Sequence, residues 1–214
     1  MFPNNRNMKK IICFITCLAL SIVAMAQTAE EILNKMDEIF SRHENDGVVM
    51  NVQTKIPILG TLTSKVYTLG DKTRMEARML GADLIIWDDG VTEWTYNPKD
   101  NEVEIAHSKA SAEEDGDADM FKGVTDGYDV SIKKETAEAW YIHCKKAKRN
   151  TNKDDPKGMD IVVDKGTYYP MSLSAKMKGV TLTMSDLSFG VTEEQVTYDP
   201  KKYASAKVVD KRDK

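Results

Sequence analysis

The chain has 214 residues, a formal net charge of −4 and 30% charged residues. This length suits a single domain with a sizeable core, and no domain linker or internal repeat is visible. The slightly acidic balance argues against nucleic acid and against anionic bilayers as the main partners.

The first 26 residues predict a targeting segment. A basic start precedes the apolar run from Ile11 to Met25, and Ala24-Met25-Ala26 supplies the small residues of a cleavage site. We therefore expect a signal peptide that is cleaved after Ala26, which leaves 27–214 as one exported domain. A retained membrane anchor is the weaker alternative, because a spanning helix needs about 20 apolar residues.

One helix is predicted directly after this segment. Thr28 and Glu31 have the spacing of a capping box, in which each side chain accepts a hydrogen bond from the other residue's backbone. Apolar residues then recur at helical spacing, at Ile32, Met36, Ile39 and Phe40. Asn45 and Gly47 are expected to end the helix.

From Val48 to His107 the pattern changes to alternating strands. Met75, Ala77 and Met79, for example, alternate with charged residues, which is typical of a half-buried antiparallel strand. Asp89-Gly90 separates two such runs and predicts a hairpin with a type I′ turn, in which both central residues have positive φ.

The segment 108–127 interrupts the strands. It is rich in acidic residues between 113 and 119, and a short helix is expected around Ala118 to Lys122. Asp115-x-Asp117-x-Asp119 resembles the start of a calcium loop, but Met120 occupies the place of the required glycine. A solvated loop is therefore the preferred interpretation, and no metal site is predicted.

Further strands follow, with a polar loop from Lys148 to Gly158. They are expected at 128–133, 140–145, 159–163, 171–177, 180–189 and 196–198. About eleven antiparallel strands and no βαβ unit predict a mainly β (α+β) fold, either a sandwich or a barrel. The economical arrangement is a curved sheet whose concave face holds the N-terminal helix and, where the helix leaves it partly uncovered, forms a ligand cavity.

The cysteines give no indication of catalysis. Cys13 and Cys17 leave with the signal segment, so Cys144 remains alone and no intramolecular disulfide is expected. His143 is adjacent to Cys144, but neighbouring residues of a strand point to opposite faces, so a thiol nucleophile paired with this histidine is not expected. The other two histidines stand alone.

The run Asp89-Gly90-Val91-Thr92-Glu93-Trp94-Thr95-Tyr96-Asn97-Pro98 resembles the signature hairpin of the LolA family of periplasmic lipoprotein carriers. The order of elements matches along nearly all of 27–214, although Leu69-Gly70-Asp71-Lys72 stands where many members have an Arg-Pro turn whose arginine holds the lid closed. The resemblance implies an unclosed barrel with a short helical or loop lid. It also implies a monomeric, soluble periplasmic protein without enzyme activity or cofactor.

Within that resemblance, an apolar cavity takes the acyl chains of a lipoprotein from an inner-membrane releasing complex and passes them to an outer-membrane receptor. The cavity wall is expected at Met50, Val52, Met75, Met79, Trp94, Tyr96, Trp140, Ile142, Leu173 and Met184. Phe40 from the helix and Phe121 from the acidic segment would fill it. Ordinary core packing is the alternative for these residues, and the methionines among them would suit cargo of varying shape.

Two other functions stay open. One is a lipid-sensing regulator of the envelope stress response, or another envelope protein that binds a hydrophobic ligand. The other is an enzyme acting on envelope glycolipids or glycans, which would require polar side chains that converge in the cavity.

Overall fold

The structure is a computed structural model that describes residues 27–79, 81–109, 124–153 and 155–212. The expected signal segment and the expected short helix at 118–122 lie outside these residues. The helical segments are α2 (Ala29–Ser41), η1 (Glu44–Asp46), α3 (Val124–Gly127) and α4 (Glu193–Val196). No helix within the described ranges has the length and apolarity needed to cross a bilayer.

Most of the chain forms strands. They are β1 (Val48–Ile56), β2 (Gly60–Leu69), β3 (Lys72–Met79), β4 (Ala82–Asp88), β5 (Thr92–Asn97), β6 (Glu102–His107), β7 (Tyr128–Glu135), β8 (Ala139–Lys146), β9 (Gly158–Asp164), β10 (Pro170–Met177), β11 (Val180–Phe189) and β12 (Lys207–Asp210).

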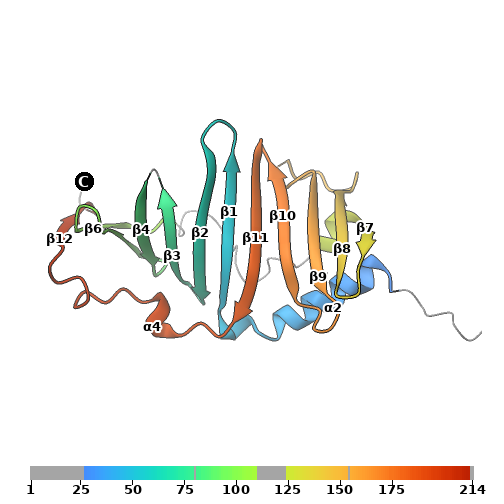
Figure 1. Cartoon of the computed structure of the whole chain (residues 1–214), viewed down its shortest axis with the longest axis horizontal. Helices are drawn as coiled ribbons and strands as arrows, with labels where there is room; N and C mark the ends of the chain where they lie inside the picture. The colour runs from blue at the N-terminus through green and yellow to red at the C-terminus, as the bar shows by residue number, and fades with distance from the viewer. Residues whose placement is uncertain (1–26, 80, 110–123, 154, 213–214) are drawn as a thin grey trace, which may run out of the picture.

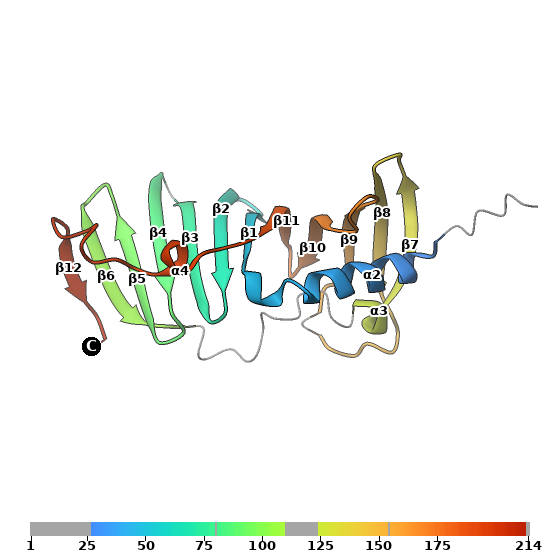
Figure 2. The ribbon, with the colours of Figure 1, turned by 90° about the horizontal axis from the view of Figure 1, so that it is seen from below.

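All twelve strands belong to one sheet, in the order β12-β6-β5-β4-β3-β2-β1-β11-β10-β9-β8-β7 (Figures 1 and 2). The pairings are antiparallel except that β12 lies parallel to β6. Strands β7 and β12 form the two edges and do not pair with each other, so the sheet is not closed, as predicted. Strand β1 meets β11 at the centre, which joins two halves of the sheet.

The N-terminal helix begins where the sequence predicts. The Thr28 backbone N–H donates to Glu31 Oε2 at 2.8 Å, and the Glu31 N–H donates to Thr28 Oγ1 at 3.1 Å, which completes the capping box. Leu33 is buried along with Ile32, Met36 and Phe40, whereas Ile39 is only half-buried. Three of the four expected positions are therefore buried as predicted, and Leu33 takes the place of Ile39 in the stripe.

Two local predictions are wrong. The turn at Asp89-Gly90 is not type I′, because only Gly90 has positive φ, while the Asp89 side chain accepts from the N–H groups of Val91 and Thr92. The segment 196–198 is not a strand. Val196 ends α4, whose capping box is formed by Thr192 and Gln195. The last strand is instead β12, which the sequence pattern did not indicate.

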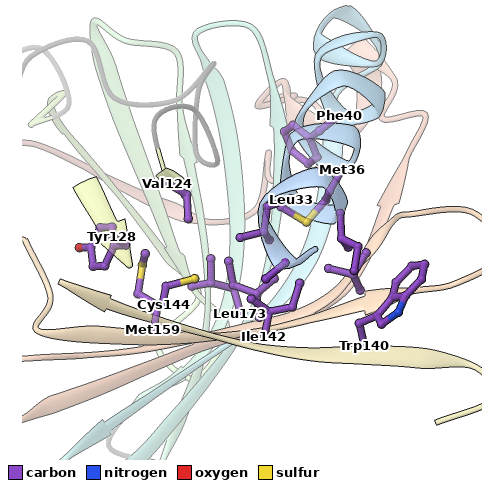
Figure 3. Packing of buried hydrophobic residues seen from close by; sticks show 14 of the residues in the cluster. Leu33, Met36, Phe40, Val124, Tyr128, Trp140, Ile142, Cys144, Met159 and Leu173 are labelled. Atoms are coloured by element: carbon purple, nitrogen blue, oxygen red, sulfur yellow. The ribbon is translucent and has the colours of Figure 1, made fainter. Parts of the chain in front are cut away.

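The two faces of the sheet carry different side chains, because side chains alternate along each strand and aligned partners share a face. We call the face that packs against α2 the helix face, and the other the opposite face. The main core lies between α2 and the helix face of β7 to β11 (Figure 3). A second, smaller core of Tyr67, Val191 and Val196 lies on the opposite face.

Candidate functional site

A continuous apolar band crosses the helix face in register. One row of aligned residues runs from β7 to β1, through Ile132, Ile142, Ile161, Leu173, Met184 and Val52. A second row continues from β1 to β4, through Met50, Val66, Met75 and Ile86. Because Met50 and Val52 are two positions apart on β1, the rows lie side by side and form one band.

Helix α2 covers one half of this band. Leu33, Met36 and Phe40 point from the helix toward the sheet, over Ile142 and Leu173 (Figure 3). The part of the band beneath α2 is shielded from solvent, since Ile142 and Ile161 have exposed fractions of 1% and 0%. The burial of these side chains stabilises the docked helix.

The C-terminal end of α2 is held by a ring cluster. Phe40 meets Phe189 edge to face with ring centroids 5.4 Å apart, and the His43 ring stacks on Phe189 at 4.4 Å. His43 Nδ1 lies 2.7 Å from Asp46 Oδ2, and its Nε2 lies 3.1 Å from the Tyr169 hydroxyl. These contacts fix the point at which the chain leaves the helix for β1.

The other half of the band is less covered. Val52, Val66, Met75 and Ile86 are half-buried, in contrast to the fully buried residues of β8 and β9. Figure 2 shows α2 beneath β7 to β1, and the band continues past it toward β4. Apolar side chains in register and only partly covered are the kind of surface that accepts a hydrocarbon ligand.

Most of the expected cavity residues lie together on the helix face. Phe40 reaches them from α2, and the sheet contributes Met50, Val52, Met75, Trp140, Ile142, Leu173 and Met184. Met79 pairs with Ala82 on the same face, although its side chain is not among those described. Phe121 lies outside the described residues.

Trp94 and Tyr96 lie on the opposite face, not on this wall. Their neighbour Thr95 pairs with Ile86, which belongs to the apolar band, so Trp94 and Tyr96 point away from it. The Trp94 ring stacks on Tyr198 at 5.4 Å, and the Tyr96 ring lies 4.6 Å from Tyr203. The expected single wall is therefore divided between two faces.

The sequence pattern did not identify the residues that cover Trp94 and Tyr96. Tyr198 and Tyr203 come from the segment between α4 and β12, and both also meet the Trp87 ring edge to face. Burial raises the pKa of both tyrosines. The sequence offered one indication of such a cover. Trp87 and Trp94 are aligned across the hairpin, and two large rings side by side require a segment that shields them from water.

A shallow pocket of about 690 Å³ lies over the centre of the sheet, and most of its lining belongs to the opposite face. Its walls are mixed: polar and charged residues such as Asn51, Lys65 and Arg78 lie beside apolar ones such as Leu84 and Ile85. Of the residues of the apolar band, only Val52 belongs to the lining of this pocket, so the half of the band beyond α2 is not enclosed by it.

The described residues assemble neither a metal site nor a reactive thiol. Among them, no group of three His, Cys, Asp or Glu side chains is placed to hold a metal ion. Cys144 is completely buried in the main core, and burial, with a smaller effect of the Asp160 charge, raises the pKa of its thiol to about 12. His143 points the other way and lies 2.8 Å from Asp160 Oδ1.

No protein-family model and no curated protein sequence matches this chain. Among solved structures, it is similar to a chain of the MucA/MucB complex from Pseudomonas aeruginosa, with 16% identity and a TM-score of 0.46. That match covers 85% of this chain and 63% of the other. It is also similar to the lipoprotein LppX from Mycobacterium tuberculosis, with 9% identity, a TM-score of 0.49, and coverage of 75% and 96%.

A third similar structure is a LolA superfamily protein from Nitrosomonas europaea, with 15% identity and a TM-score of 0.33. The match covers 81% of this chain and 99% of the other. A protein of the LolA superfamily is thus among the solved structures that resemble this chain. At 16% identity or less, these three similarities concern the fold alone.

Proposed function

We propose that this chain is an exported carrier that binds the acyl chains of lipoproteins on the helix face and moves them across the periplasm. More generally, it is an envelope protein that binds a hydrophobic ligand. The observation that carries the proposal is the apolar band, which continues beyond the cover of α2 as half-buried side chains at Val66, Met75 and Ile86.

The band supplies the free energy of binding. Each acyl CH₂ removed from water contributes about 0.8 kcal/mol, so a long chain gains roughly 10 kcal/mol if it is covered along its whole length. Met50, Met75 and Met184 present flexible thioethers along the band, which can repack around acyl chains of different shape.

Release follows from competition with the protein's own helix. Leu33, Met36 and Phe40 already occupy the band over β8 to β11. A ligand that extends into this half must displace α2, which lowers the net affinity by the free energy of docking the helix. A carrier needs this compromise, because cargo that binds too tightly is not delivered.

The cellular context is part of the same proposal. Residues 1–26 would direct export and be cleaved after Ala26, and 27–214 would act as one domain. The partners would be acylated lipoproteins, an inner-membrane complex that releases them and an outer-membrane receptor that accepts them.

The test compares two neighbouring isoleucines of β4. Ile86 belongs to the apolar band, whereas Ile85 pairs with Glu76 and Tyr96 on the opposite face, and both are half-buried. We expect Ile86→Ser to weaken the binding of a synthetic diacylated lipopeptide about tenfold, since about 1.4 kcal/mol of apolar contact is lost. Ile85→Ser should leave the affinity near that of the parent.

Binding is measured by titration calorimetry, and thermal melts of both variants control for folding. Mass spectrometry of lipids that copurify with the parent gives an independent result, with diacylated peptides expected. Equal affinities of the two variants for the lipopeptide, or no binding by the parent, would contradict the proposal.

A further inference from the structure

We propose that the end of the sheet formed by the β1–β2 and β10–β11 hairpins is a docking surface for anionic phospholipid membranes, with Ile58 and Leu59 inserted among the lipids. This surface lies at the strand ends, away from the acyl-binding band of the proposed function, and its use does not depend on that function. In Figure 1 the β1–β2 hairpin reaches beyond the neighbouring strand ends at the upper edge of the sheet.

The tip of this hairpin is apolar and open to solvent. Ile58 and Leu59 have exposed fractions of 106% and 74%, the two highest among the large apolar side chains described. They are adjacent at the point that protrudes furthest, so they form a patch and are not scattered single residues. Adjacent, fully exposed large side chains are unfavourable in water and mark a surface that meets another apolar phase.

The backbone at the tip is strained at Ile58. Ile58 has φ of 73°, in the left-handed region that a β-branched residue rarely adopts. Glycine or asparagine would form the same turn with less strain. A strained, exposed isoleucine contributes nothing to packing within the fold, and the strain points to a side chain that acts outside it.

The neighbouring hairpin extends the patch. Met177 pairs with Val180 at the end of β10 and β11, directly beside the pair Ile56 and Gly60 of β1 and β2. Met177 is exposed and Val180 is half-buried. The two hairpins therefore present an apolar edge that is wider than a single loop.

The charge at this end is opposite to that of the whole chain. Lys55 and Lys176 flank Thr181 in one cross-strand row, and Lys178 lies in the adjoining turn. The two hairpin ends, 55–61 and 175–181, contain no acidic residue, although the chain as a whole carries −4. Basic residues around an apolar tip are complementary to a surface of anionic lipid headgroups.

The next loop along the sheet adds further positive charge. Residues 147–157 connect β8 to β9 at the same end of the sheet, because Gly158 pairs with Lys145 and Met159 with Ala175. This loop contains four basic and two acidic residues, and its Arg149 is paired with Asp129 of β7 at 3.3 Å. The β3–β4 turn is balanced, since Arg78 lies 3.6 Å from Asp83. Although the whole chain is acidic, the two hairpin ends and the loop beside them carry a local excess of positive charge.

The test measures cosedimentation with two kinds of vesicle, one of phosphatidylethanolamine and phosphatidylglycerol and one of phosphatidylcholine alone. The parent protein should bind the anionic vesicles, and less at high salt, because exposed charges are screened. Leu59→Asn should lower the partition coefficient about tenfold, and I58N/L59N should abolish binding.

Val91→Asn is the matched control. Val91 is 70% exposed, but it lies in the β4–β5 turn at the other end of the sheet, so its replacement should leave binding unchanged. All variants share the same N-terminal segment, so the comparison isolates the tip. Asparagine tolerates positive φ, and I58N/L59N should therefore melt no lower than the parent.

Three results would overturn the proposal: no binding of the parent to anionic vesicles, unchanged binding of I58N/L59N, or an equal loss in Val91→Asn. Lipopeptide binding separates this proposal from the carrier function. I58N/L59N should retain lipopeptide affinity while losing vesicle binding, and Ile86→Ser should lose lipopeptide affinity while retaining vesicle binding.

Discussion

At the scale of single residues, Cys144 and Tyr128 show how the main core shapes side-chain chemistry. Both are buried, Tyr128 on β7 and Cys144 on the neighbouring strand β8. The Tyr128 hydroxyl donates to the Pro156 carbonyl at 3.0 Å. Burial first, and the Asp155 charge second, raise the pKa of Tyr128 from 10.0 to about 12, while that of Cys144 rises from 9.0 to about 12. In the folded chain, both groups stay neutral at neutral pH.

These shifts predict an alkaline loss of stability. Between about pH 9 and 12 the unfolded chain releases these two protons while the folded chain keeps them, so the free energy of unfolding falls as pH rises through that window. Urea unfolding at a series of alkaline pH values measures the slope. The variant C144A/Y128F should show a shallower slope than the parent, and an unchanged slope would contradict the assignment.

At the scale of elements, the C-terminal segment is fastened to the opposite face by aromatic contacts. The Trp94 and Tyr198 rings are nearly parallel, at 15°. Tyr203 lies against Trp87 and Tyr96, and Lys72 pairs with Glu193 of α4. These contacts join residues about a hundred positions apart in the sequence.

A double-mutant cycle measures this fastening. Trp94→Ala and Tyr198→Ala should each destabilise the fold, and the double variant should be less destabilised than the sum by about 0.5–1.5 kcal/mol, the usual coupling of an aromatic pair. Urea unfolding of the four proteins gives the coupling. Strict additivity would show that the two rings do not interact in solution.

The sequence predicted where most strands and the N-terminal helix lie better than it predicted what each of them packs against. Strand alternation correctly placed Trp94 and Tyr96 on one face of β5, because a period of two fixes relative facing. It contained no information on which face meets α2, since that depends on pairing with β4 and β3. Likewise, Val196-Thr197-Tyr198 alternates like a strand, although Thr192 and Gln195 form a capping box that indicated the short helix.

The candidate site was predictable in part for the same reason. Met50, Val52 and Met75 lie in strands whose alternation is regular, and they share the helix face. The division of the expected wall between two faces could not be predicted, because it follows from the cumulative register of the sheet. The covering role of Tyr198 and Tyr203 depends on contacts across the whole chain.

At the scale of the whole molecule, the sheet has two open lateral edges, one on the side of β7 and one on the side of β12, and the chain protects them in different ways. On β7, the register shifts between Ile132 and Lys134, and exposed lysines follow. Strand β6 is instead covered by β12, where Lys207 pairs with Glu102 and the Lys211 N–H donates to the Ile105 carbonyl at 2.8 Å. Such protection prevents pairing between sheets of different molecules.

Removal of β12 should therefore cause self-association. A variant that ends at Ala206 leaves the outer backbone groups of β6 unpaired, and we expect dimers or larger species that increase with concentration. Sedimentation velocity measures the change. K207A/K211A retains the strand but not its ion pairs and should behave as the parent does, whereas a truncated chain of unchanged mass distribution would contradict the role of β12.

The central pairing of β1 with β11 also affects how the chain is made. Asn51 is aligned with Ser185 across this ladder, and the Asn51 side chain donates to Asp186 at 2.8 Å. Because the ribosome synthesises the chain from its N-terminus, β1 is complete long before β11 has been made. The middle of the molecule forms only after nearly all of the polypeptide has emerged, so folding during synthesis is restricted to the local hairpins, and the late closure of this large loop is the expected slow step.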